Sequence, residues 1–532
     1  MAEDRRVVRA AGVIGFYTLL SRIFGLVRDA VIANFFEARG VADAWVVAFK
    51  IPNTFRRLFG EGSLTASFIP VYTESLNKDP REESDKIAHI SMTISVILLI
   101  ILSVTGVVLA PLLVRVIAPG YLGVSEKFIL TVSLTKWMFP YIFFIGLVAL
   151  CMGILNSLRH FTAPALAPVL LNLSLILSTL LLYNYFAQPV YALALGVLIG
   201  GITQLALQIP FLYRVGVRPK INFSFFHPAI GRIFKLMVPA ILGLAVYQIN
   251  TLVSTFFASR LPGGNTYLYF ADRLIQFPLG VFAIAIATAA LPSLSRLAAD
   301  NRMEELMDTL NFSLRLAFFV AIPAMVGLII IRVPILNVLF QRGKFDFFTV
   351  RMTAQAVLFF ALGLWAFSGV RIIVSAFYSL KDMKTPVYVA IVALLTNIIL
   401  CKLLVGPLEH GGLALAISLS SAINMLLLLL ILRRRFGTIG AGKILGSIFK
   451  AVLSSLLMGG LIYWLSGYGE WTVAADDIYG LVVKAGRLLG VIVVGTGVYL
   501  ASCYLLKNSE LSFLLEGLRR RLKGTGDSGG DL

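Results

Sequence analysis

The sequence predicts an all-α polytopic membrane protein with about 14 transmembrane helices. Three observations predict this class: an apolar composition, hydrophobic runs of helix length along the whole chain, and cationic residues gathered in alternate loops. Of the 532 residues, 58% are hydrophobic and only 14% are charged, and the mean hydropathy is +0.89. A water-soluble domain of this size needs more charge, so the composition favours a membrane protein.

Apolar runs of about 20 residues recur from end to end, and a helix of that length crosses a hydrocarbon core about 30 Å thick. Windows of about 19 residues locate the expected helices. These lie near residues 11–35, 41–75, 87–117, 126–156, 163–186, 190–214, 229–259, 265–296, 309–340, 346–379, 385–405, 411–433, 443–466 and 479–506.

Lys and Arg gather in alternate loops, which predicts the orientation of the chain. The net charge of +19 would also suit nucleic acid, but its spread over short loops is typical of the cytoplasmic side of a membrane protein. The cationic loops contain Arg5/Arg6/Arg9, Lys78/Arg81/Lys86, Arg159, Arg214/Arg218/Lys220, Arg296/Arg302, Lys381/Lys384, Arg433/Arg434/Arg435 and Arg519/Arg520/Arg521/Lys523. The other loops are poorer in cations, Arg342 and Lys344 excepted. We therefore expect a multi-pass protein with both termini cytoplasmic.

A shift of 222 residues superimposes two regions of the chain. It places Ser157-Leu158-Arg159 on Ser379-Leu380-Lys381, and Pro70 on Pro292. Because six spans separate the copies, both have the same orientation, and transport sites usually lie between such halves. The expected organisation is a six-helix lobe at 1–220, a second at 221–440, two extra helices at 441–508 and a basic tail at 509–532.

Charged residues fall inside the predicted spans. Each costs about 2.5–3.5 kcal/mol at mid-bilayer on insertion scales, so such residues are expected to face protein or water and are candidates for function. They are Arg22, Arg28 and Asp29 in the first span, Asp43, Lys50, Arg56, Arg57 and Glu61 in the second, Asp272 and Arg273 in the eighth, and Arg371 in the tenth.

Several of these charges have an acid on their own helix. Residues seven apart lie nearly on one face, so Asp43, Lys50 and Arg57 align, with Glu61 one turn beyond. These four could simply neutralise one another. For Lys50 and Arg57, pairing and substrate binding both remain open.

Two further pairs follow from spacing. Arg22 and Asp29 are also seven apart, so Arg22 has the same two interpretations, and Asp272 stands beside Arg273. Asp29, Asp43, Glu61 and Asp272 are thus supporting positions together with Arg22, Lys50 and Arg57.

Arg56 points about 100° away from the Arg57 face and has no acid at helical spacing on its own span. Arg28 also has no acid three or four residues away. These two, with Arg273, are the expected substrate-binding residues. The planar, permanently charged guanidinium group suits phosphate oxygens, whereas acidic rings suit cations. The implied cargo is a phosphate-type anion.

The sequence contains no signature of an enzyme. It has no Walker motif, no HExxH pair and no nucleophile elbow, and its four His residues fall near span ends or loops. Cys151, Cys401 and Cys503 lie far apart in apolar segments, as inert core thiols do. We expect no catalytic residue, no metal site, no cofactor and no ATP-driven pump.

The motifs around these arginines resemble those of one family. The first two spans carry Ser21-Arg22-Ile23-Phe24-Gly25-Leu26-Val27-Arg28-Asp29, Phe49-Lys50-Ile51-Pro52-Asn53 and Arg56-Arg57-Leu58-Phe59-Gly60-Glu61-Gly62. Later parts carry Tyr269-Phe270-Ala271-Asp272-Arg273-Leu274, Leu291-Pro292-Ser293-Leu294-Ser295 and Phe377-Tyr378-Ser379-Leu380-Lys381-Asp382. Together, over residues 10–435, they resemble the MurJ (MviN) lipid II flippases of the multidrug/oligosaccharidyl-lipid/polysaccharide exporter superfamily.

The resemblance implies two six-helix lobes around a central cavity, with two terminal helices at 443–506 that form a groove for a lipid tail. It implies cavity arginines at Arg28, Arg56 and Arg273, the three that the charge sorting also selects. The implied cargo is lipid II, an undecaprenyl-diphosphate-linked disaccharide-pentapeptide flipped to the periplasmic leaflet of the bacterial inner membrane. Membrane lipids and cell-wall synthesis proteins are the other implied partners. The span at 229–259 has no Asp or Glu, which disfavours sodium coupling.

Three alternatives remain at this stage. A drug/cation antiporter of the same superfamily would be expected to use embedded acids. Composition does not exclude a polysaccharide-repeat lipid flippase, and only the motif match favours a lipid II flippase over it. A scaffold for wall-synthesis partners would tolerate neutral residues in place of the cavity arginines.

Overall fold

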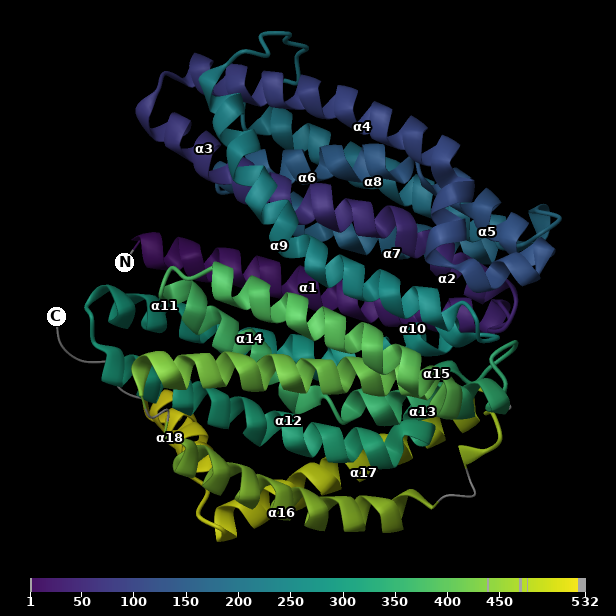
Figure 1. Ribbon diagram of the computed structural model, residues 1–532, viewed down its shortest axis with the longest axis vertical. Coiled ribbons are helices and arrows are strands. Elements are labelled where there is room, and N and C mark those ends of the chain that lie inside the picture. The colour runs from purple at the N-terminus through teal and green to yellow at the C-terminus, as the bar shows by residue number, and fades with distance from the viewer. Residues whose placement is uncertain (1, 438–439, 468–470, 476, 525–532) are drawn as a thin grey trace. The chain divides into compact units, whose positions relative to one another are not determined.

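The computed structural model describes residues 2–437, 440–467, 471–475 and 477–524, although not the side chains of residues 2–11, 14, 59–61, 242 and 517–524. Helices make up the secondary structure of this described part, which confirms the predicted class (Figure 1). The helices of the first half are α1 (Ala2–Phe35), α2 (Val41–Phe55), α3 (Thr65–Lys78), α4 (Arg81–Ile117), α5 (Ser125–Met138), α6 (Tyr141–Ser157), α7 (Thr162–Leu182), α8 (Tyr191–Arg214) and α9 (Pro228–Ala258). Those of the second half are α10 (Gly264–Pro278), α11 (Ile284–Ala299), α12 (Met303–Phe340), α13 (Phe347–Ala361), α14 (Leu364–Ser379), α15 (Lys384–Phe436), α16 (Ala441–Ser466), α17 (Ile478–Leu505) and α18 (Ser509–Gly524).

Short 3₁₀ and π segments connect or interrupt these helices. The 3₁₀ segments are η2 (Pro119–Gly123) and η3 (Tyr183–Tyr185), and the π segments are η1 (Arg56–Leu64) and η4 (Leu279–Ala283). Shifted back by the 222-residue repeat, η4 falls on residues 57–61, inside η1. The two halves therefore share an unusual local backbone as well as sequence landmarks.

Among the described residues, nine helices are long and apolar enough to cross a membrane, or up to eleven if each bent pair is one span. The bent pairs are Pro228–Ile241 with Gly243–Ala258, and Phe347–Ala361 with Leu364–Ser379. Helix α15 is two helices joined at a kink, because Glu409 has the non-helical angles φ 49° and ψ −131°. Such a break is expected between the predicted spans 385–405 and 411–433. The chain is a multi-pass membrane protein, and these segments are consistent with about fourteen spans.

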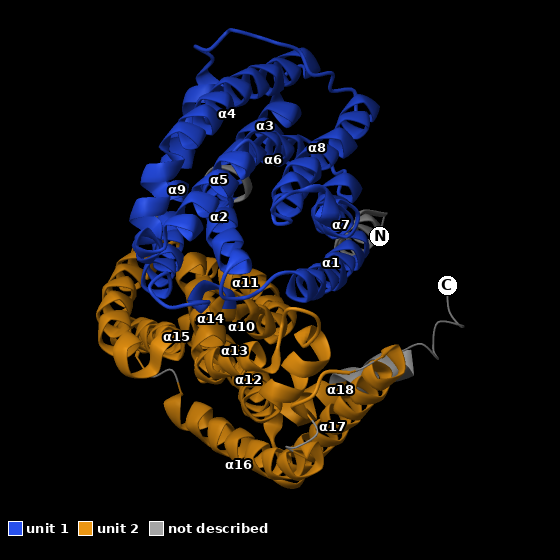
Figure 2. Cartoon of the chain, turned by 90° about the vertical axis from the view of Figure 1, so that its right-hand side faces the viewer, with its two compact units in different colours: residues 1–266 blue, residues 267–532 orange. Residues whose placement is uncertain are grey.

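The chain divides into two compact units, Met1–Thr266 and Tyr267–Leu532 (Figure 2). In unit 1, α7 packs on α1 and α8, α6 packs on α4 and α8, and α9 packs on η1, α3 and α4. The apolar core of this unit includes Phe68, Tyr72, Ile90 and Ile154. The boundaries at residues 220 and 440 come from the sequence repeat and remain predictions.

In unit 2, α12 packs against α13, α14 and α16, while α14 packs on α11 and α15. One apolar core joins α11, α12, α14 and α15 around Leu294, Leu310 and Phe377. Another joins α12 to α16 and α17 through residues that include Phe319, Met458 and Tyr499. The two expected extra helices therefore pack as a pair on α12.

Candidate functional site

Arg28 lies on α1 and is 7% exposed. Its Nε and Nη2 atoms donate to Asp29 Oδ1 at 2.9 and 2.6 Å, and its Nη1 atom donates to Asn172 Oδ1 on α7 at 2.8 Å. The Asn172 amide also donates to the Ser21 carbonyl oxygen at 3.0 Å. Asn172 thus ties two turns of α1 together and orients the guanidinium group of Arg28.

These contacts correct one expectation about the first span. Arg28 was expected to lack an acidic partner on its own helix, yet it pairs with the adjacent Asp29. Arg22, for which pairing with Asp29 and substrate binding were both open, lies half-buried on the same helix. The Arg28 side chain is long enough to fold back to its neighbour, although adjacent Cβ atoms on a helix diverge.

Arg56 begins the π segment η1 and is half-buried. Its Nε atom donates to Asn53 Oδ1, one turn earlier on α2, at 2.8 Å. Arg57 is exposed, and the Glu61 side chain with which it was expected to pair lies outside the described side chains. A π segment often marks a functional site, and this one begins at the predicted ligand Arg56.

Two charges of the second span, Lys50 and Asp43, have partners on other helices. Lys50 donates to Thr255 Oγ1 on α9 at 3.2 Å. Asp43, which is fully buried, pairs with Lys127 Nζ on α5 at 2.5 Å. Helical spacing within one span does not predict either of these partners.

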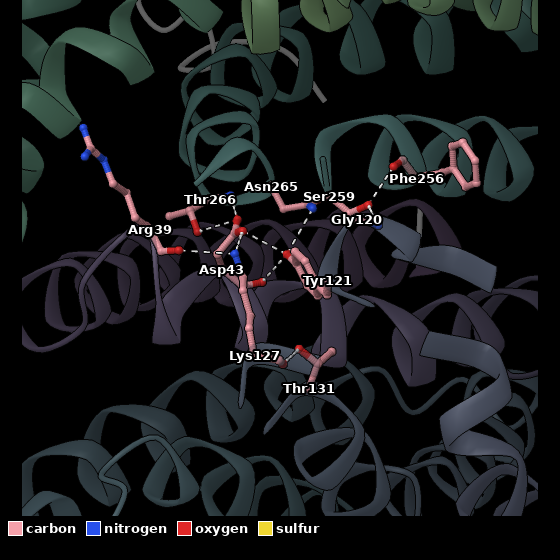
Figure 3. A network of polar contacts seen from close by, with 10 residues as sticks. All are labelled: Arg39, Asp43, Gly120, Tyr121, Lys127, Thr131, Phe256, Ser259, Asn265 and Thr266. Carbon is pink, nitrogen blue, oxygen red and sulfur yellow. Dashed lines mark hydrogen bonds and ion pairs between the residues drawn. The ribbon is translucent and has the colours of Figure 1, made fainter. Parts of the chain in front are cut away.

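Asp43 is the centre of a polar network in unit 1 (Figure 3). Its carboxylate accepts hydrogen bonds from the Tyr121 hydroxyl at 2.9 Å, from the Thr266 amide at 3.0 Å and from the Thr266 hydroxyl at 3.2 Å. Asn265 donates to the Tyr121 oxygen at 3.3 Å. Burial and the Asp43 carboxylate raise the pKa of Tyr121 well above its usual value, so Tyr121 remains a hydrogen-bond donor.

Arg273 lies on α10, in unit 2. Its Nη2 atom donates to the Tyr269 hydroxyl at 3.0 Å, and its guanidinium carbon lies 4.7 Å from the centre of the Tyr269 ring. Asp272 accepts from Gln276 Nε2 at 3.3 Å. Arg273 thus bonds to a residue four positions earlier on α10 and Asp272 to a residue four positions later, and the two do not bond to each other.

The structure thus places Arg28, Arg56 and the Asp43 network in unit 1 and Arg273 in unit 2. Sequence reasoning missed Tyr121, Lys127 and Asn172, because no helical spacing connects them to their partners. In the described part of the chain, no group of three or more His, Cys, Asp or Glu residues could hold a metal ion. The three cysteines are buried and unpaired, as expected of core thiols.

A multi-pass helical fold with several embedded arginines defines a membrane transporter class, and the fold itself is known. It is similar to the inward-facing conformation of a multidrug resistance MATE family transporter of the MOP superfamily, with a TM-score of 0.68 and 16% identity over 79% of this chain and 96% of that one. At this identity the likeness shows the fold alone.

The sequence narrows the class to one family. A family model described as lipid II flippase MurJ matches residues 32–476. A probable lipid II flippase MurJ of Vibrio cholerae is 36% identical over 512 residues, covering 94% of this chain and 97% of the relative. A solved structure of lipid II flippase MurJ in an inward closed conformation has a TM-score of 0.75 and 27% identity, covering 92% of this chain and 99% of that one. The chain belongs to the MurJ family of lipid II flippases.

Proposed function

We propose that this protein carries lipid II from the cytoplasmic to the periplasmic leaflet of the bacterial inner membrane by alternating access. Membership of the lipid II flippase family is the observation that carries the proposal. The cargo follows from the name of that family, and transport rather than catalysis is the inferred activity. The cationic loops favour an orientation with both termini in the cytoplasm.

Arg28, Arg56 and Arg273 are the proposed ligands of the diphosphate. Guanidinium groups bind phosphate oxygens through two parallel charge-assisted hydrogen bonds, and burial strengthens such bonds. The partners of Arg28, Asp29 and Asn172, hold its side chain in one orientation before a ligand arrives. Less side-chain entropy is then lost on binding.

The lipid tail is assigned to the surface of the α16–α17 pair. Undecaprenyl is too apolar to leave the membrane, so a flippase must pass the head group through protein while the tail remains in lipid. Exposed apolar side chains line both helices, including Leu456, Leu457, Val482 and Val493. These side chains suit contact with a prenyl chain.

The membrane potential is the proposed driving force. Moving about two negative charges outward across an inside-negative potential of about 100 mV releases roughly 4.6 kcal/mol. Sodium coupling is disfavoured because α9 contains no Asp or Glu. No cofactor is proposed.

A depletion-rescue experiment tests the proposal. The gene is expressed in cells whose own lipid II flippase is depleted, and lipid II in the outer leaflet is measured by labelling from outside. Restored labelling and growth are expected. If labelling stays at the depleted level while the protein is folded and in the membrane, the proposed function is wrong.

A further inference from the structure

The loop that joins α8 to α9 (residues 215–227) carries a cluster of exposed apolar side chains. Ile221, Phe223 and Phe226 are 77%, 67% and 104% exposed, and Phe225 is 39% exposed. The Phe223 and Phe225 rings pack against each other with their centres 5.8 Å apart. Large apolar side chains gathered on an exposed loop mark an interaction surface, because their contact with water is unfavourable.

Hydrogen bonds hold this α8–α9 loop along the first turns of α4. His89 Nε2 donates to the Arg218 carbonyl oxygen at 2.7 Å, and the Asn222 amide donates to Thr93 Oγ1 at 2.9 Å. The loop therefore follows α4 for about one helical turn. Figures 1 and 2 show the loop on the side of α4 that faces away from α6 and α8.

The position along α4 places the loop at the depth of lipid head groups. Exposed apolar side chains of α4 begin at Ile97 and continue to Val116, so we expect hydrocarbon from Ile97 onward. Thr93 precedes Ile97 by one turn, which is about 6 Å along the helix. Because the head-group layer extends roughly 5–8 Å beyond the hydrocarbon core, the loop backbone at Asn222 lies in that layer. A Phe side chain of the loop can reach the hydrocarbon from there.

Two cations accompany the apolar cluster. Arg218 and Lys220 are exposed, and neither forms an ion pair within the part of the chain that the structure describes. On α4, Asp85 pairs within its own helix, and Glu83 contacts His227. Exposed cations beside exposed apolar side chains are typical of a segment that lies on a membrane surface and attracts anionic lipids.

We propose that the α8–α9 loop is an interfacial anchor, whose apolar side chains enter the cytoplasmic leaflet in the proposed orientation and whose Arg218 and Lys220 bind the head groups of anionic phospholipids. A soluble partner protein could cover the same side chains only if the loop stood clear of the membrane. The hydrogen bonds to His89 and Thr93 hold the loop at the depth of the head groups instead. The anchor goes beyond the proposed transport and does not depend on the cargo.

The anchor also fixes the start of α9, which begins at Pro228 directly after the loop. The Ala229 amide donates to His227 Nδ1 at 3.2 Å, and His227 Nε2 lies 2.6 Å from Glu83 Oε1 on α4. Because Nδ1 accepts, Nε2 carries the proton and donates to the carboxylate. Lipid binding by the loop should therefore fix the depth of both α4 and the first turn of α9.

Fluorescence from one labelled cysteine in nanodiscs tests the anchor. Cys151, Cys401 and Cys503 are replaced by Ala, and Phe226→Cys carries a nitrobenzoxadiazole label, whose emission depends on its surroundings. Nanodiscs contain either phosphatidylcholine alone or equal parts of phosphatidylcholine and phosphatidylglycerol. Each cation near an anionic surface favours contact about fivefold. We therefore expect blue-shifted emission with phosphatidylglycerol, and quenching by doxyl-labelled lipids about twofold stronger or more than in phosphatidylcholine alone.

Two variants and one reporter serve as comparisons. Arg218→Gln with Lys220→Gln should reduce quenching to the level measured in phosphatidylcholine alone. Arg433→Gln with Arg434→Gln is the matched control, because it removes the same charge from another cationic loop at exposed positions, and quenching should remain unchanged. A label on Lys78→Cys, at the exposed end of α3, should stay in water and be insensitive to quenching lipids.

Three outcomes would contradict the proposal. A label at position 226 that stays in water in both kinds of nanodisc would overturn the anchor and assign the apolar cluster to a soluble partner. Equal quenching in both kinds of nanodisc, or quenching that survives Arg218→Gln with Lys220→Gln, would overturn the binding of anionic head groups. The measurement needs no transport, so a protein that anchors as expected but moves no lipid II would refute the proposed function alone.

Discussion

Arg28→Ala, measured with and without Asp29→Ala, distinguishes a substrate ligand from a structural ion pair. Arg28 makes three hydrogen bonds to Asp29 and Asn172, and Asp29 is only 2% exposed. The single change leaves a buried carboxylate without its guanidinium partner. Breaking a buried pair in this way costs about 3–5 kcal/mol, so the folded yield of Arg28→Ala should fall.

Removing the carboxylate as well should restore most of that stability, because the buried charge that lost its guanidinium partner is then also absent. The double variant should still fail to flip lipid II, since the proposed phosphate ligand remains absent. Folded protein is measured by size-exclusion chromatography after graded heating, and flipping by labelling of outer-leaflet lipid II. Recovery of both stability and flipping would refute the assignment of Arg28 as a substrate ligand.

Three further predictions address energetics, the second unit and pH. Dissipating the membrane potential with an ionophore at constant pH should stop flipping, whereas replacing sodium should not; the opposite dependence in a vesicle assay would exclude the proposed driving force. Tyr269→Leu should weaken transport more than Tyr269→Phe, because only Leu removes the ring beneath Arg273, a contact of about 0.5–2 kcal/mol; equal transport rates would contradict this. Burial raises the pKa of Asp382, but hydrogen bonds from Thr385 and the ion pair with Arg435 outweigh burial and lower the pKa from 3.8 to about 2. Asp382 therefore contributes its full stabilisation of the folded protein above pH 3.8, and this stabilisation is lost as the pH falls toward 2. Asp382→Asn should lower the stability by about 0.2–1 kcal/mol at neutral pH and make the thermal stability depend less on pH between about 4 and 2. A variant with the same pH profile as the parent protein would contradict the Asp382–Arg435 pair.

Hydropathy was enough to predict the helical class and the break inside α15. The apolar runs on either side of Glu409 end where the backbone leaves the helical region. A span is a local property of about 20 consecutive residues, so a single sequence reveals it. Family motifs then extended the prediction to lobes and function, which hydropathy cannot provide.

The partners of the embedded charges could not be predicted in the same way. Lys127 is 84 positions from Asp43, and Asn172 is 144 positions from Arg28. Helical periodicity compares residues within one helix, whereas membrane helices satisfy polar groups across their interfaces. Asn172 is an ordinary polar residue in an apolar run, and no local signal distinguishes it from a solvated or packing residue.

The internal partners of Arg28 bear on how a flippase releases its cargo. A transport site must bind strongly enough to load and weakly enough to unload. An arginine paired with Asp29 already has an anionic partner, so a diphosphate gains only the difference between its own hydrogen bonds and those it displaces. The same pair keeps the guanidinium group satisfied after the cargo leaves, and the empty protein need not hold an isolated buried charge during its return. In the proposed mechanism, Asp29 therefore limits affinity and supports turnover.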